Sequence, residues 1–185
     1  RKGNAGTQLS VFRLNSCMKK IYRAGWEVFE PDSGEIVKKF VKLCEEYGFI
    51  GLYPLDNVID FNQEKNKIAQ DIYKANVNLI NQCDIVIANI NAFRGKEADS
   101  GTIWECGYAS ALGKKVFGYM KKEQNYIDTF SKDETKLLNN VVVDLDNRFI
   151  EDFDYPINLM IACSVENIVF GTFEDCLKEL VKWVW

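Results

Sequence analysis

The segment from Asp84 to Tyr119 constrains the fold more than any other part of the sequence. It opens with the nearly all-apolar run DIVIANI, which is typical of a parallel strand covered on both faces. A polar loop, a predicted helix over 101–112 and a second strand from Lys115 follow. In open parallel sheets, ligands bind at the carboxyl edge, where helix N-termini point into the crevice. The segment therefore predicts an α/β sheet with a binding site near the start of this helix.

The alternation of strand and helix continues along the rest of the chain. Apolar runs predict strands at 21–24, 49–53, 84–90, 115–120 and 167–170. Apolar residues at helical spacing predict helices at 35–47, 67–82, 101–112, 158–163 and 173–183, the first of them ended by Gly48. We expect an α/β fold with a single doubly wound, mostly parallel five-stranded sheet, flavodoxin-like or Rossmann-like, with helices on both faces.

Two segments depart from this pattern. Residues 1–17 have an unusual composition, and Met18 looks like a native start, so we expect 1–17 to be a leader or a vector-derived extension. Residues 121–153 are rich in Lys, Asp, Glu and Asn apart from the apolar run Val141–Val143. A polar insertion of this length is more often a lid or an interface arm than a linker.

Composition excludes several classes of function. The net charge is −4 with acids and bases interleaved, and without a basic stripe we expect no nucleic-acid partner. No stretch is apolar enough to cross a bilayer, so we expect no membrane partner. The six cysteines never form CxxC, which favours reduced, buried thiols of a cytoplasmic protein over disulfides or zinc. The absence of histidine excludes Ser-His and Cys-His nucleophile pairs and histidine-ligated metals.

Glu105 is the leading candidate for a catalytic group. It lies near the start of the 101–112 helix, six residues after Asp99. A lone helical glutamate is ordinarily a solvated surface residue, but Gly101 and Tyr108 share its face and suggest a tight site. A partly desolvated carboxylate favoured by the helix dipole can stay ionised and act as a nucleophile. Asp99 is either an N-terminal cap of the helix, a ligand contact, or both.

The turn after the first strand supplies a second group of candidates. Tyr22 is expected to reach the Glu105 carboxylate, since both lie at the same edge of the sheet. Gly25 and Trp26 are candidate substrate-binding residues, and Trp26 could lie against a heteroaromatic ring. The turn has one glycine and is followed by Glu27, so it lacks a phosphate cradle and its acids would repel phosphate. An uncharged ligand is favoured.

Two further polar positions are open to either a structural or a binding role. Asp56 follows the second strand within Pro54-Leu55-Asp56-Asn57, which fits a plain turn better than a ligand contact. Asn76 lies on an otherwise apolar helical face, as a buried structural amide or a hydrogen-bond partner of a base.

These segments, taken together from Met18 onward, resemble the nucleoside 2-deoxyribosyltransferases. The matching motifs stand in the same order along the chain: IY-x-AG at 21–25, PLDN at 54–57, Asn76, DIVIAN at 84–89, FRG at 93–95, DSGT-x-x-E-x-GY at 99–108 and PINLM at 156–160. Residues 18–185 would then form one deoxyribosyltransferase-like domain that contains the 121–153 insertion.

The resemblance implies a role for each candidate. Glu105 would be the nucleophile, Tyr22 its hydrogen-bond partner, and Asp99 the stronger candidate for proton transfer, because Asn76 stands where some members have Asp. The base pocket would be walled by Trp26 and Phe93. A homo-oligomer is implied, in which Asn158 belongs to the site of a neighbouring subunit and binds the 5′-hydroxyl of the sugar. Met160, from the same motif, is a further substrate-binding candidate.

The implied activity is base exchange on 2′-deoxynucleosides in nucleoside salvage, through a covalent deoxyribosyl-glutamate and without a metal or redox cofactor. The substrates would be 2′-deoxynucleosides and free purine or pyrimidine bases. The nearest alternative is an N-glycoside hydrolase of 2′-deoxynucleoside 5′-monophosphates, which would need a phosphate site. A non-catalytic nucleotide-binding module is a further alternative, but it would not need Glu105, Asp99 and Tyr22 together. An FMN carrier is disfavoured because no phosphate loop is evident.

Overall fold

The computed structural model describes residues 18–54 and 59–184. The expected leader 1–17 and the candidate Asp56 lie outside the described residues. Within the described ranges, no helix is both long and apolar enough to span a bilayer.

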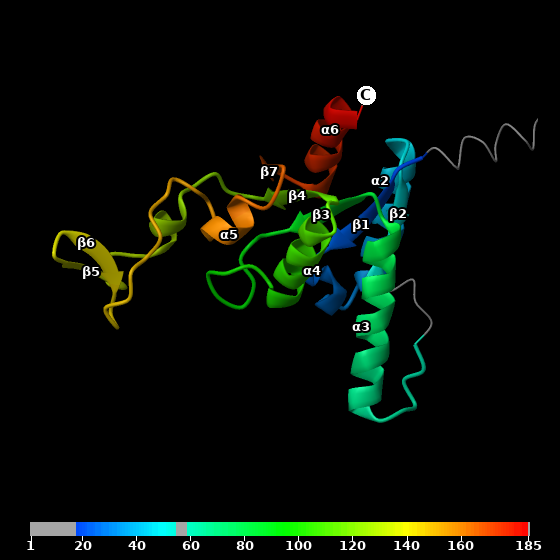
Figure 1. Cartoon of the computed structure of the whole chain (residues 1–185), viewed down its shortest axis with the longest axis horizontal. Coiled ribbons are helices and arrows are strands. Elements are labelled where there is room, and N and C mark those ends of the chain that lie inside the picture. Colours follow the sequence, from blue (N-terminus) through cyan, green and yellow to red (C-terminus); the bar gives the residue numbers. More distant parts are fainter. Residues whose placement is uncertain (1–17, 55–58, 185) are drawn as a thin grey trace, which may run out of the picture.

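Five parallel strands form the central sheet (Figure 1). Their order across the sheet is β2 (Ile50–Leu52), β1 (Lys20–Ala24), β3 (Ile85–Asn89), β4 (Lys115–Met120) and β7 (Asn167–Phe170). This is the flavodoxin-like order, in which ligands bind at the point where the order reverses. The predicted fold class is confirmed.

Helices cover both faces of this sheet. On one face, α3 (Lys65–Gln82), α4 (Ser100–Ala111) and α5 (Leu159–Ala162) pack against a core that includes Tyr22. On the other face, α2 (Ser33–Glu46) and α6 (Phe173–Val184) pack against a core that includes Ile21. Figure 1 shows α6 and α4 on opposite sides of the strands. Successive residues of β1 therefore point to different layers, as the pleat of a strand requires.

The predicted helices and strands are present, and their ends match or are shifted by one or two residues. The 3-10 helix η1 (Trp26–Phe29) directly after β1 was not predicted. A single turn of four residues is too short to show a helical repeat of apolar positions.

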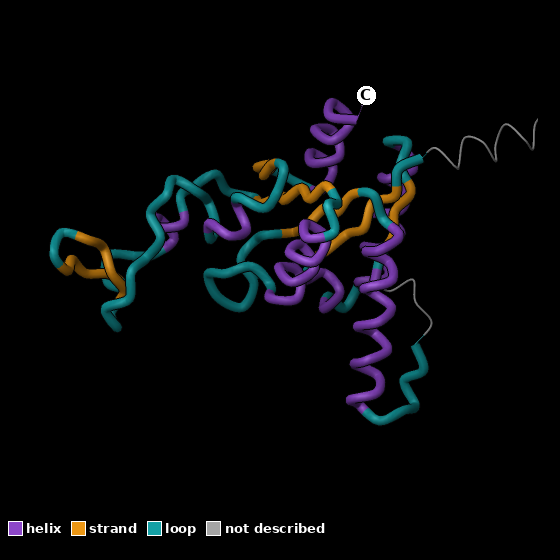
Figure 2. Tube along the Cα trace, viewed as in Figure 1, coloured by secondary structure: helices purple, strands orange, loops and turns teal. Residues whose placement is uncertain are grey.

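The 121–153 insertion holds structure that its composition does not reveal. It contains a 3-10 helix, η3 (Tyr126–Thr129), and an antiparallel hairpin of β5 (Thr135–Leu138) and β6 (Val141–Asp144). Asn139 and Asn140 join the strands with φ angles of 50° and 65°, as a two-residue hairpin turn requires. Figure 2 shows this hairpin at the end of an arm that extends away from the main sheet.

The described cysteines are all unpaired. Cys44, Cys83, Cys106 and Cys176 are buried in the two cores, and Cys163 is exposed. Burial raises the pKa of the Cys44 thiol to about 12, so this sulfur stays a neutral, apolar packing group.

Candidate active site

The site forms where α4 crosses the carboxyl half of β1. Tyr22 is fully buried in β1, and its hydroxyl donates a hydrogen bond of 2.6 Å to Oε1 of Glu105. Glu105 is half-buried in the second turn of α4. Cys106 and Ala109 of the same helix are buried against the sheet, so packing of α4 directs the carboxyl toward β1. The contact expected between Tyr22 and Glu105 is therefore present.

The environment of Glu105 shifts its protonation equilibrium toward the neutral acid. Burial raises the pKa of Glu105 to about 7, the Tyr22 hydrogen bond acts to lower it, and the nearby charge of Asp99 raises it further. The sequence suggested a carboxylate kept ionised by the helix dipole, but desolvation outweighs that effect here. Burial, followed by the charge of Glu105, also raises the pKa of Tyr22, which keeps its hydroxyl protonated as a donor.

Asp99 caps the N-terminus of α4. Its Oδ2 accepts hydrogen bonds from the backbone nitrogen of Thr102 at 2.9 Å and from the Thr102 hydroxyl at 3.0 Å. Within the described residues its Oδ1 accepts no hydrogen bond, so one oxygen of this half-buried carboxyl remains for a ligand. Capping and ligand contact are thus compatible roles for Asp99.

An aromatic stack lies beside the turn after β1. The rings of Trp26 and Phe93 are stacked with centroids 5.5 Å apart, and Phe93 stacks in turn on Phe29 at 5.6 Å. The guanidinium of Arg94 lies over Phe93 at 4.6 Å. Sequence reasoning selected Trp26 and Phe93 but missed Phe29 and Arg94. Both of these lie in segments where neither helical nor strand periodicity applies.

Two buried polar atoms of the candidate residues have no partner within the described chain. They are the indole Nε1 of Trp26 and the amide Oδ1 of Asn76. Since buried polar groups are almost always hydrogen-bonded, each is a candidate to bind a polar group of a ligand.

Close packing explains why position 25 holds a glycine. A Cβ at this position would lie 2.1 Å from Oε2 of Glu27 and 3.1 Å from Cβ of Asn89. Glu27 itself is buried and ion-paired with Arg23. The ion pair compensates part of the Glu27 charge within the core, so this residue weighs less against a phosphate near the turn than the sequence suggests.

Asn158 and Met160 lie at the start of α5 rather than beside Glu105. The Asn158 side chain accepts a hydrogen bond from the Met160 backbone nitrogen at 2.9 Å and donates one to Glu151 at 2.6 Å. The Met160 side chain is 72% exposed. Among the described residues, the hydrogen bonds of the Asn158 side chain go to Met160 and Glu151, and to none of the candidates on the other elements.

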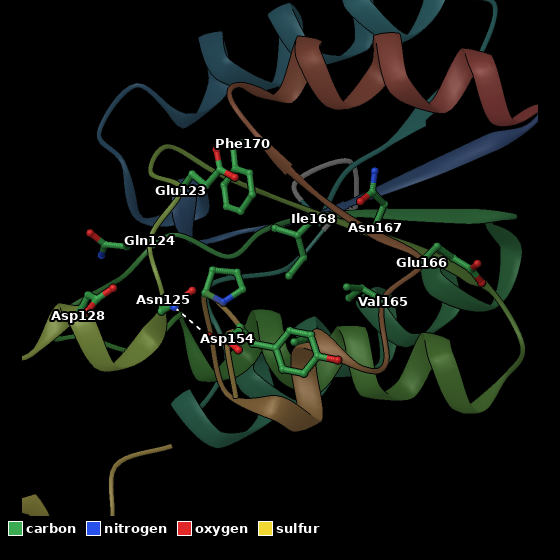
Figure 3. A pocket seen from close by; sticks show the side chains of 13 residues that line it. Glu123, Gln124, Asn125, Asp128, Asp154, Val165, Glu166, Asn167, Ile168 and Phe170 are labelled. Atoms are coloured by element: carbon green, nitrogen blue, oxygen red, sulfur yellow. Dashed lines mark hydrogen bonds between the residues drawn. The ribbon is translucent and has the colours of Figure 1, made fainter. Parts of the chain in front are cut away.

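A cavity lies away from the candidate residues. It has a volume of about 570 Å³, and Figure 3 shows it lined by residues of β7 and of the 123–128 and 154–156 segments. None of the candidate residues lines it. A smaller cavity of about 310 Å³ has Trp26, Ile90 and Pro156 in its wall. In the described ranges, no three Cys, Asp or Glu side chains are grouped in a way that would hold a metal ion.

Comparisons with known proteins point to one family. The model of the family described as nucleoside 2-deoxyribosyltransferase matches residues 21–160. The structure of a 2-desoxiribosyltransferase from Leishmania mexicana superposes with a TM-score of 0.73 and 30% identity, covering 90% of this chain and 99% of that one. A 2-deoxyribosyltransferase from Bacillus psychrosaccharolyticus shares the fold, with a TM-score of 0.55 and 20% identity over 88% of this chain and 90% of that one.

One curated relative is an uncharacterised protein of Schizosaccharomyces pombe. It is 28% identical over 109 residues, which are 57% of this chain. The matched stretch spans about half of that relative, 52% of its length.

Proposed function

Because this chain belongs to the nucleoside 2-deoxyribosyltransferase family, we propose that it exchanges the nucleobase of 2′-deoxynucleosides for a free purine or pyrimidine base, a reaction of nucleoside salvage. The observation that carries the proposal is the buried hydrogen bond between Tyr22 and Glu105. It holds a carboxyl group at the carboxyl edge of a parallel sheet, where ligands of this fold bind.

The proposed reaction proceeds by two displacements at C1′ of the sugar. The Glu105 carboxylate forms a bond to C1′ as the bond to the departing base breaks, which gives a deoxyribosyl ester. The incoming base then attacks C1′ on the opposite side of that ester and releases Glu105, so the β configuration is retained. The Tyr22 hydroxyl orients Oε1, which leaves Oε2 of Glu105 as the attacking oxygen.

Proton transfer to the departing base falls to Asp99. Its carboxyl is close enough to Glu105 to influence the pKa of that group. Its Oδ2 is engaged with Thr102, so the proton would travel through Oδ1. Trp26 and Phe93 would provide the aromatic wall for the base, and the Asn76 amide would bind a polar edge of the substrate.

The site would be completed by a second copy of the chain. The Met160 side chain is exposed and Asn158 lies at the surface end of α5, where a neighbouring subunit could receive them. In this arrangement Asn158 would bind the 5′-hydroxyl of the sugar held by the neighbour.

A base-exchange assay tests the proposal. Deoxyadenosine is incubated with hypoxanthine, and deoxyinosine and adenine are followed by chromatography, with dAMP as an alternative donor. Deoxyinosine formed in proportion to adenine released supports transfer. Adenine release from dAMP alone, without any product on the acceptor base, would contradict it and indicate an N-glycosidase.

A further inference from the structure

A buried polar cluster lies on the face of β1 opposite to Glu105. We call it the Glu27 cluster, and its members are Arg23, Glu27, Asn89 and Tyr119. Glu27 Oε1 accepts hydrogen bonds from the Tyr119 hydroxyl at 2.8 Å and from Asn89 Nδ2 at 2.8 Å, and it pairs with the Arg23 guanidinium. Arg23 Nη2 also donates to the Tyr119 hydroxyl at 3.1 Å. All four residues are less than 10% exposed.

The pairing within the cluster is not complete. Oε2 of Glu27 and Nε of Arg23 are buried without a hydrogen-bond partner among the described residues. The Arg23 guanidinium is instead enclosed by the rings of Phe40 and Phe173, at 5.6 and 5.2 Å. Removing charges from water is costly, and a pair that leaves polar atoms unmatched recovers only part of that cost. Stability alone therefore does not account for an ion pair at this position.

The cluster is connected to Trp26 through the backbone. Glu27 is the next residue after Trp26 in η1, a single turn of helix with no side-chain cap. The Glu27 carboxyl is in close contact with Gly25, where a Cβ would lie 2.1 Å from Oε2. Arg23, Asn89 and Tyr119, which all belong to strands of the sheet, therefore anchor η1 through the side chain of Glu27. This anchor sets where the Trp26 indole lies relative to the sheet.

The cluster is also connected to Phe93. Asn89 Oδ1 accepts hydrogen bonds from the backbone nitrogen of Asn91 at 3.1 Å and from its Nδ2 at 2.6 Å. Asn91 Oδ1 in turn accepts one from the backbone nitrogen of Lys121 at 2.9 Å. This chain of bonds fixes the loop that leads to Phe93. Both stacked aromatic rings are thus tied to the Glu27 carboxyl, although they come from different loops.

We infer that Glu27 is a positioning residue for the nucleobase site, which fixes Trp26 and, through Asn89 and Asn91, Phe93. The expected effect of Glu27 on catalysis rests on the proposed function. The expected effect on the positions of the Trp26 and Phe93 rings does not. Tyr22 and Glu105 lie on the other face of β1, so a disturbance of the cluster should change binding of the base more than the chemistry at C1′.

The kinetic test uses Glu27→Gln, which keeps the size of the side chain. The glutamine side chain places a neutral oxygen beside Arg23 in place of a charged one. Its NH₂ group lies against Gly25, where no hydrogen-bond acceptor of the described residues is in reach. We expect KM for the acceptor base to rise about tenfold while kcat at saturating base stays within about twofold of wild type. The matched control is Leu177→Val, an apolar change in the same core that removes none of the hydrogen bonds of the cluster. It should lower thermal stability and leave KM unchanged.

A fluorescence test needs no activity. Trp104, Trp183 and Trp185 are replaced by Phe, so that emission reports Trp26 alone, and quenching by acrylamide is measured. Quenching should increase when Glu27→Gln is added to this background and should not change with Leu177→Val. Should Glu27→Gln fail to fold, Tyr119→Phe, which removes one donor to Glu27, replaces it, with an expected rise in KM of about threefold.

The outcomes separate the two proposals. An unchanged KM together with unchanged Trp26 quenching in these variants would overturn the positioning role. Wild-type protein without base exchange, but with Trp26 quenching that responds to Glu27→Gln, would overturn the proposed function and leave the anchoring of Trp26 intact.

Discussion

The Tyr22 hydroxyl lies 2.6 Å from Oε1 of Glu105, although 83 positions separate the two residues in the chain. One comes from the first strand and the other from the fourth helix, so the pair exists only in the folded protein. A short hydrogen bond of this kind both orients a carboxyl group and favours its ionised form. It therefore links the position of Glu105 to its acidity.

Replacement of Glu105 tests the assignment of the nucleophile. We expect Glu105→Ala to lower base exchange by more than about a thousandfold, because no covalent ester can form. The fold and the oligomeric state of the wild type should be retained, since this side chain is not in the apolar core. Initial rates with deoxyadenosine and hypoxanthine provide the measurement, and circular dichroism and gel filtration are the controls. Exchange at a normal rate in this variant would rule out Glu105 as the nucleophile.

Loss of the Tyr22 hydroxyl should slow the chemical step. In Tyr22→Phe the ring still fills the core, but Glu105 loses a donor that is directed at its charge. We expect kcat to fall about a hundredfold, the usual effect of one such hydrogen bond. Single-turnover kinetics would isolate the step. If kcat were unaffected, Tyr22 would have no part in the mechanism.

The pH dependence follows from the raised pKa of Glu105. The attacking carboxyl must be ionised, so kcat/KM should increase as the pH rises through about 7. The Tyr22 hydrogen bond lowers this pKa and the charge of Asp99 raises it. The rising limb should therefore move to higher pH in Tyr22→Phe and to lower pH in Asp99→Asn. Profiles measured from pH 5 to 9 would reveal both shifts, and shifts of the opposite sign would contradict the assignment.

The same raised pKa predicts how stability varies with pH. The folded protein retains the Glu105 proton up to about pH 7, whereas the unfolded chain releases it near 4.5. Stability contributed by this group is therefore present at low pH and is lost as the pH rises through this window. Glu105→Gln removes the effect and should stabilise the protein at pH 8 by up to about 3 kcal/mol, reduced by the water that reaches a half-buried group. Urea unfolding at pH 4.5 and 8 measures the difference, which should vanish at the lower pH.

The two roles of Asp99 can be separated by choice of substitution. Asn also caps helices, so Asp99→Asn should keep stability near wild type while exchange falls by about a hundredfold or more through loss of the acid. Asp99→Ala removes both functions and should cost about 1 kcal/mol of stability in addition. Thermal unfolding and exchange rates are compared for the pair. Equal activity in Asp99→Asn and wild type would leave Asp99 with capping alone.

Mixing two inactive variants tests the shared site. Glu105→Gln and Asn158→Ala each disable every site of their own oligomer in the proposed arrangement. In a mixed oligomer, some sites combine an intact Glu105 from one subunit with an intact Asn158 from the other, so exchange activity should reappear. The variants are unfolded together, refolded and assayed, with each variant alone as the control. Activity no higher than that of the separate variants would argue against a site completed by a neighbour.

The sequence reveals those parts of the molecule that depend on buried apolar runs. Residues 85–89 of the DIVIANI run form β3 and are buried throughout, and the strand predicted at 115–120 matches β4. The contact between Tyr22 and Glu105 was also predictable, because the ends of parallel strands and the starts of the following helices meet at one edge.

The parts that escaped prediction depend on polar and aromatic contacts between loops. Glu27 follows a turn and is charged, so it is expected at the surface. The ion pair with Arg23 and the hydrogen bonds from Asn89 and Tyr119 make its burial possible. The stack of Phe29 on Phe93 joins two loops of irregular conformation. The hairpin of β5 and β6 depends on an Asn139-Asn140 turn within a polar segment, where the alternation of side chains is weak.

Tyr22 and Arg23 are adjacent in β1, where they pair with Val86 and Ile87 of β3. The Tyr22 side chain nevertheless contacts Glu105, whereas the Arg23 side chain contacts Glu27 on the other face of the sheet. A single inserted or deleted residue upstream in this strand would interchange their layers, placing a guanidinium beside Glu105 and a phenol among the rings of Phe40 and Phe173. Both halves of the pocket would be lost together, whereas a point substitution at either position would disturb only one of them. We therefore expect this strand to accept exchanges of side chain more readily than any change of its length.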